Sequence, residues 1–90
     1  MVAQMQRTEW PEWWQWELEL TPHLLKRMAD RQFNEVDLRQ MLVAPRGYRP
    51  SEELGRYVIE TLFDNRAWEV VVEPQAEERI LLVITAFAVQ

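Results

Sequence analysis

The sequence contains no cysteine, only two glycines and a single histidine. Without cysteine, disulfide bonds, thiolate nucleophiles and cysteine-ligated zinc sites are all excluded. The chain also lacks a glycine-rich phosphate loop and any recognised zinc spacing, so we expect neither a metal ion nor another cofactor. A chain without thiols is compatible with the reducing cytoplasm, where we expect this protein to work.

Long apolar runs are missing as well. The longest, ILLVITAFAV at residues 80–89, is interrupted by a threonine and is far shorter than the roughly 20 residues of a transmembrane helix. The N-terminal stretch MVAQMQRTEWPEWW has no continuous apolar core of the kind that signal peptides carry. We therefore expect a soluble intracellular protein without a membrane partner.

Basic residues are outnumbered, because ten Lys and Arg against fifteen Asp and Glu leave a formal net charge of −5. This balance argues against a polyanionic partner, since nucleic-acid affinity rests largely on cations that neutralise phosphates. The distribution weakens the argument: residues 23–56 carry seven basic and five acidic groups, whereas residues 57–90 carry two basic and six acidic groups. The positive charge therefore lies in the middle third of the chain.

The chain does contain enough apolar material for one core. Apolar residues make up 48% of its 90 residues, with five Trp, three Phe and two Tyr, which excludes disorder, and the length excludes a second domain. We expect one domain over residues 1–90, in which residues 1–12 form a flexible or partner-covered N-terminal segment.

The hydrophobic pattern predicts an α+β fold of order β-α-α-β-β-β. WWQWELEL alternates apolar and polar residues with the period of a half-buried strand. Thr21 followed by Pro22, and later Asn34, are typical helix starts. We expect strands at 14–20, 56–63, 68–74 and 80–89, helices at 22–32 and 34–45, and a mobile loop at 46–54. The expected buried helix positions are Leu24, Leu25 and Met28, then Val36, Met41 and Leu42, with Leu38 at the flank.

The single histidine begins a polar stripe on the first predicted helix. At 100° per residue, His23, Arg27 and Arg31 follow one another along a line beside the apolar face. Such a stripe could hold a proton-transferring group and two phosphate-binding cations, which RNA cleavage through the 2′-hydroxyl requires. Equally, the arginines could pair with carboxylates and the histidine could simply start the helix, because a lone histidine seldom defines a catalytic site.

Arg56 and Thr85 are further candidates. Arg56 follows Gly55 at the start of a predicted strand, either as a site cation or as a charge that protects a sheet edge from aggregation. Thr85 interrupts the most apolar strand, so its hydroxyl is either an internal anchor or a substrate contact. Glu69 and Glu73 share one strand face, roughly 13 Å apart, which is too far to share a proton, and we expect that face to be solvated.

Four tryptophans crowd residues 10–16, with more aromatic surface than one short strand can bury against two helices. Aromatic side chains can stack on unpaired bases, but the glutamates around these tryptophans repel phosphate. We therefore expect Trp13, Trp14 and Trp16 to contact a protein partner or a second copy of this chain as a homodimer.

The order of these motifs resembles a known bacterial family. His-x3-Arg-Met-x2-Arg opens the first helix, Gly55-Arg56 opens the next strand, and VVV and VITAF mark the last two strands. Over residues 17–87 the chain resembles the small, uncharacterised toxin-like domain family of bacterial toxin–antitoxin gene pairs. That family is similar to BrnT and, more distantly, to the RelE-type messenger-RNA interferases.

The resemblance implies two helices packed on a curved antiparallel sheet, with RNA on the concave face and a cognate antitoxin as protein partner. It implies metal-independent RNA cleavage with His23, Arg27 and Arg56 as catalytic residues, and with Arg31 and Thr85 as substrate-binding residues. The acidic balance, and Phe87 where the family often has tyrosine or histidine, favour an alternative function. This alternative is a non-catalytic protein-interaction module on the same fold, which contacts partners or itself through the Trp-rich strand.

Overall fold

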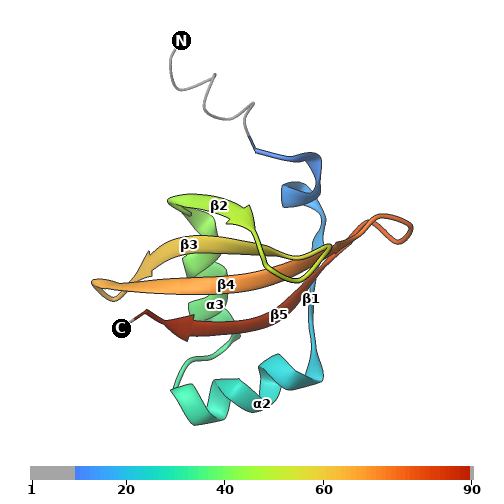
Figure 1. Cartoon of the computed structure of the whole chain (residues 1–90). Coiled ribbons are helices and arrows are strands. Elements are labelled where there is room, and N and C mark those ends of the chain that lie inside the picture. Colours follow the sequence, from blue (N-terminus) through green and yellow to red (C-terminus); the bar gives the residue numbers. More distant parts are fainter. Residues whose placement is uncertain (1–9, 90) are drawn as a thin grey trace.

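A five-stranded sheet with two helices packed against it forms the fold of the computed structural model (Figure 1). The structure describes residues 10–89, so most of the predicted N-terminal segment 1–12 lies outside the described residues. The elements are η1 (Glu12–Gln15), β1 (Glu17–Leu20), α2 (Pro22–Arg31), α3 (Glu35–Val43), β2 (Gly47–Pro50), β3 (Tyr57–Phe63), β4 (Arg66–Gln75) and β5 (Ile80–Ala88). The predicted α+β class is confirmed. Neither helix in this part of the chain is long and apolar enough to cross a membrane.

The strand order is β1-β5-β4-β3-β2, so the first strand in the sequence lies beside the last. Strands β3 to β5 pair antiparallel in sequence order, as expected, and β2 extends this sheet on β3, but β1 runs parallel to β5. The expectation of a fully antiparallel sheet is therefore wrong for β1. The physical reason is the connection: two helices and three strands separate β1 from β5, and a connection of this length permits parallel pairing.

Two predicted segments have a different structure from the one expected. Residues 47–50, expected in a mobile loop, form the edge strand β2 on β3. β2 is short, carries a charged residue and ends in proline, features that hinder an edge strand from pairing with another chain. It therefore lacks the hydrophobic alternation by which a strand is predicted. Residues 14 and 15, expected in the first strand, belong to the 3-10 turn η1 that follows Pro11.

The core lies between the helices and one face of the sheet. Its fully buried side chains include Leu24, Leu38, Met41, Ile59, Val70, Val72 and Val83. The predicted burial of Leu25 and Val36 is wrong, because their residues are 53% and 64% exposed. Each helix touches the sheet along a narrow stripe, Leu24 and Met28 on α2 and Leu38, Met41 and Leu42 on α3. Leu25 lies about 100° around α2 from the fully buried Leu24, and Val36 about 160° around α3 from Leu38, so both point to solvent.

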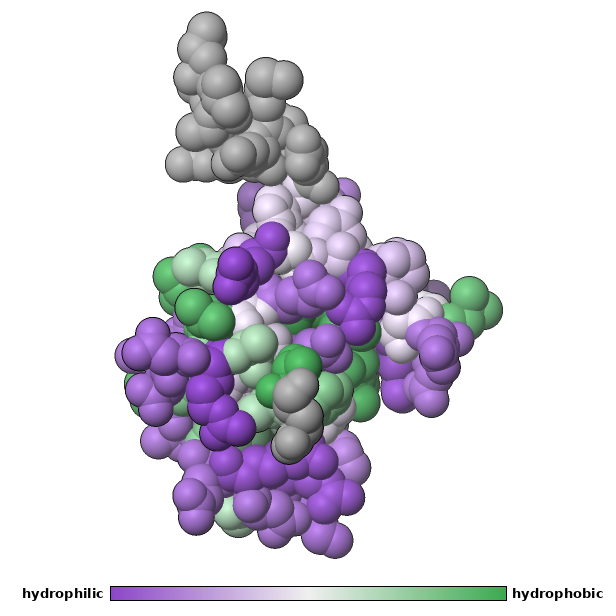
Figure 2. Space-filling view, turned by 60° about the vertical axis from the view of Figure 1, so that its left-hand side comes forward, coloured by the Kyte–Doolittle hydropathy of each residue, from purple (hydrophilic) through white to green (hydrophobic). Residues whose placement is uncertain are grey.

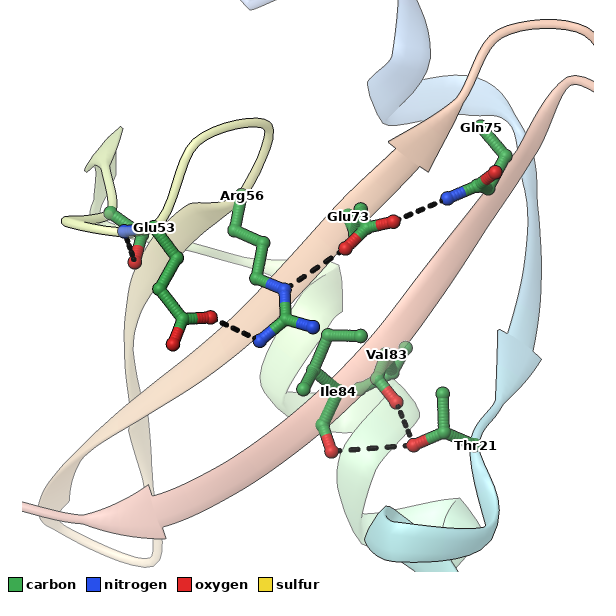
Figure 3. A network of polar contacts seen from close by, with 8 residues as sticks. Thr21, Glu53, Arg56, Glu73, Gln75, Val83 and Ile84 are labelled. Atoms are coloured by element: carbon green, nitrogen blue, oxygen red, sulfur yellow. Dashed lines mark hydrogen bonds and ion pairs between the residues drawn. The ribbon is translucent and has the colours of Figure 1, made fainter.

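Thr21 joins three elements at one point. It directly follows the last residue of β1, and its hydroxyl oxygen accepts a hydrogen bond from the Leu24 amide at 3.2 Å, which caps α2 as predicted. The same hydroxyl donates to the Val83 carbonyl of β5 at 2.9 Å. The hydroxyl also lies 3.3 Å from the Ile84 carbonyl oxygen, and Figure 3 shows both contacts. The start of α2 is thereby attached to the middle of β5.

A β-bulge in β5 changes which side chains face the helices. Val72 pairs with Val83, but Val71 pairs with Thr85, so Ile84 is an extra residue on β5. Before the bulge, Leu81 and Val83 face the core; after it, Ala86 does. Without the extra residue, strict alternation would place Thr85 in the core with Val83. The bulge instead aims Thr85 at the face opposite α3.

Neighbouring leucines on α2 give a direct test of this packing. We expect Leu24→Ala to lower the free energy of unfolding by about 2–5 kcal/mol, because it leaves a cavity in the core. Leu25→Ala, the same change one residue later on the exposed side, should stay within about 1 kcal/mol. Urea denaturation of both variants measures the difference, and equal losses would contradict the packing of α2.

The Thr21 hydroxyl should be worth more than an ordinary helix cap. We expect Thr21→Val to lower the free energy of unfolding by about 1–2 kcal/mol, since both the α2 cap and the bond to β5 are lost. Thr21→Ser keeps the hydroxyl and serves as the control in the same denaturation experiment. A loss in Thr21→Ser as large as in Thr21→Val would assign the effect to the methyl group instead.

Candidate functional site on the open face of the sheet

The face of the sheet opposite α3 carries an arginine–glutamate network. On this face the side chains of β3 and β4 include Glu60, Glu69 and Glu73. Arg49 of β2 bridges Glu60 and Glu69, and Arg56 pairs with Glu73. The prediction of a merely solvated glutamate face is therefore incomplete, because both Glu69 and Glu73 are half-buried by cations from neighbouring segments.

A hollow of about 440 Å³ opens in this face. Its lining combines the apolar side chains of Val58, Val71 and Ile84 with the polar ones of Arg49, Arg56 and Thr85. We call the apolar part the floor and the charged part the rim. The β5 bulge contributes both Ile84 and Thr85, which is why two consecutive residues of one strand can line the same hollow.

Arg56 is held from two sides (Figure 3). Its Nε donates to Glu73 Oε1 at 2.9 Å, and one of its two terminal nitrogens donates to the Glu53 carboxylate. The hydrogen bond to Glu73 raises the pKa of Arg56 above its usual value, with a further contribution from the charge of Glu53 and against the effect of desolvation. Gly55, whose φ of 86° favours glycine, makes the turn into Arg56. Since β3 is an interior strand, Arg56 does not protect a sheet edge.

Arg31 reaches from the end of α2 to β5. One of its terminal nitrogens donates to Thr85 Oγ1 at 3.1 Å and to the Ala86 carbonyl at 2.9 Å. β1 pairs only with residues 80–83 of β5, so the later part of β5 has no strand on this side. Arg31 supplies the donor that a neighbouring strand would otherwise provide. Thr85 thus contacts Arg31 and lines the hollow beside Arg56.

The structure separates the predicted stripe of α2 into different environments. Arg27 pairs with Asp30 at 3.1 Å, as the structural alternative predicted, although its buried Nε has no hydrogen-bond partner within residues 10–89. His23 is exposed in the first turn, and among residues 10–89 it makes no hydrogen bond or ion pair. It lies about 12 Å along the helix from Arg31, given the rise per residue of an α-helix. The outer surface of α2, at the bottom of the view in Figure 2, is mostly hydrophilic.

Sequence reasoning missed three members of this site, namely Arg49, Glu53 and the role of Glu73. Arg49 lies on the edge strand that the pattern did not predict. Glu53 lies in the loop before Arg56, three residues away, a spacing that suits an ion pair but is too common to indicate one. The available signal was the shared strand face of Glu69 and Glu73, which called for cations opposite them.

The tryptophans pack on their own chain. The rings of Trp10 and Trp13 lie 4.9 Å from those of Tyr48 and Tyr57, respectively. Trp14 lies 4.7 Å from Trp10, and the Trp16 ring carries the Arg79 guanidinium at 5.7 Å. Tyr48, on the strand missed by the sequence pattern, thus supplies packing surface for the aromatic residues that we judged to be in excess. The interface role of Trp13, Trp14 and Trp16 stays a prediction.

A double-mutant cycle tests the contact between α2 and β5. We expect Arg31→Ala and Thr85→Val to couple by about 0.5–1 kcal/mol in the free energy of unfolding, because either change alone breaks the same hydrogen bond. Arg27→Ala combined with Thr85→Val is the matched control, since Arg27 binds Asp30 instead. Additivity of the Arg31 and Thr85 changes would exclude the contact in solution.

The comparisons with known proteins place this chain in a family. No curated protein and no solved structure matches it. The family model described as a domain of unknown function, DUF4258, matches residues 20–88. That span covers α2, the β5 bulge and every residue that lines the hollow. The chain therefore belongs to the DUF4258 family.

Proposed function

We propose that this protein binds single-stranded RNA on the open face of its sheet and cleaves it without a metal ion, as the toxin-like member of a toxin–antitoxin pair. One observation carries the proposal. Arg49, Arg56 and Thr85, from three separate segments, line one hollow, and Arg31 binds the Thr85 hydroxyl at 3.1 Å. Two cations and a hydroxyl around an apolar floor suit a phosphodiester and the bases beside it.

The chemistry would proceed through the ribose. A base takes the proton from the 2′-hydroxyl, whose oxygen attacks the neighbouring phosphorus while the bond to the 5′-oxygen breaks and that oxygen gains a proton. Arg56 would stabilise the charge that develops on the phosphate, and Arg31 with Thr85 would hold the strand. His23 is the candidate for proton transfer, and it lies about 12 Å along α2 from Arg31, so a strand that contacts both must follow the helix. Like any arginine, Arg56 would stay cationic throughout.

One observation favours the alternative of a protein-interaction module. Each cation at the rim of the hollow already has carboxylate partners: Glu60 and Glu69 for Arg49, Glu53 and Glu73 for Arg56. Such a neutralised face attracts RNA less strongly than free arginines would. A protein that brings its own charged side chains could exchange these pairs, with an antitoxin as the candidate partner.

RNA cleavage in the presence of a chelator tests the proposal. We expect Arg56→Ala to slow cleavage of a mixed-sequence RNA by about 100-fold or more, the usual cost of losing a charge stabiliser in the transition state. Arg66→Ala is the matched control, because Arg66 begins β4 at the opposite end of β3. His23→Ala and Arg31→Ala, compared in the same assay, separate proton transfer from strand binding through the split of kcat and KM.

The result also decides between the two functions. Cleavage lost in Arg56→Ala but retained in Arg66→Ala, with both variants folded by circular dichroism, supports the nuclease. RNA binding that weakens with salt, without cleavage, limits the function to RNA recognition. If the pure protein neither binds nor cleaves RNA, the proposal is refuted in favour of the interaction module.

A further inference from the structure

The two carboxylates that hold Arg56 differ in how firmly the structure fixes them. Glu73 lies on the interior strand β4, its side chain is 29% exposed, and its second oxygen accepts a hydrogen bond from Gln75 Nε2. Glu53 lies in the loop between β2 and β3, and its side chain is 68% exposed. Glu73 is therefore a fixed partner of Arg56, and Glu53 is an exposed one.

They also bind different atoms of the guanidinium (Figure 3). Glu73 accepts from Nε, which leaves the two terminal nitrogens of Arg56 to face other ligands. Glu53 binds one of those terminal nitrogens. A carboxylate at this position presents an oxygen where a phosphate oxygen would bind, because arginine recognises both groups through the same donors.

The loop that carries Glu53 is closed at its base and exposed at its tip. Ser51 N donates to the Arg56 carbonyl at 2.9 Å, and Arg56 N donates to the Glu53 carbonyl at 3.2 Å. Residues 52–55 between them are all exposed. The Glu53 side chain can therefore leave Arg56 by rotation alone, without breaking the backbone bonds of the loop, and an exposed ion pair resists this only weakly.

We propose that the Glu53 carboxylate is an intramolecular competitor for phosphate: it occupies the ligand-facing edge of Arg56 until a phosphodiester displaces it, while Glu73 keeps the guanidinium in position. The inference rests on the proposed function, since it takes the phosphodiester of RNA as the displacing ligand. It makes Glu53 a residue that sets affinity and selects for strands able to outcompete a carboxylate. An anion that binds arginine only weakly would not displace Glu53 and would therefore not reach Arg56.

The test compares two neighbouring glutamates. Glu52 also lines the hollow and is exposed, but it makes no ion pair with Arg56 among the described residues. Glu53→Gln and Glu52→Gln therefore remove the same charge from adjacent positions. By fluorescence anisotropy with a labelled single-stranded RNA at fixed salt, we expect Glu53→Gln to tighten binding about fivefold and Glu52→Gln less than twofold. In an Arg56→Ala background the gain from Glu53→Gln should disappear.

A second probe separates this inference from the proposed function. Inorganic phosphate is titrated into each variant while the Nε–H signal of Arg56 is followed by NMR. A larger response to phosphate in Glu53→Gln than in Glu52→Gln, without RNA binding by any variant, keeps the competition and refutes RNA as its ligand. Equal effects of the two substitutions on both RNA affinity and the phosphate response would overturn the inference, even if the protein binds RNA.

Discussion

The hydroxyl of Thr21 is the contact on which the rest of the arrangement depends. It caps α2 and binds the Val83 carbonyl, so the helix start is fixed against β5 at the residue before the bulge. α2 then runs beside β5, and Arg31, at its last position, reaches the unpaired part of that strand. The side chain directly after β1 thus fixes the start of α2 against β5, and the ten residues of the helix carry Arg31 to the unpaired part of that strand.

The second requirement for the site is the bulge in β5, which reverses the faces to which successive side chains of the strand point. Thr85 belongs to the open face only because Ile84 is inserted into β5 opposite Val71 and Val72. Bulges redirect side chains in this way without altering the rest of a ladder. The bulge and the Thr21 bond lie side by side, since Val83 takes part in both. The same short stretch of β5 therefore receives the helix, changes its own alternation and lines the hollow with two side chains.

The elements that carry their own local signals could be predicted from the sequence. Thr21 and Asn34 are helix caps as expected, and β3 to β5 follow their apolar runs closely. The edge strand β2, the parallel pairing of β1 and the bulge were missed, because none of them leaves a periodic pattern. The five predicted catalytic and substrate-binding residues lie in three different environments: Arg56 and Thr85 line the hollow with Arg31 bound to Thr85, Arg27 pairs within α2, and His23 is exposed. Helical spacing alone cannot tell which residue of a stripe meets a neighbouring strand.

The parallel pairing of β1 with β5 has a consequence for the order in which the protein is made. Glu17–Leu20 find their partners only in residues 80–83, more than sixty positions later. On the ribosome, β1 and the tryptophans before it must wait for nearly the whole domain to be synthesised, while local helices can already form. The hollow and its arginines therefore come together only after β5 has left the exit tunnel. Until β5 joins the sheet this surface is absent, because Ile84 and Thr85 supply part of its lining.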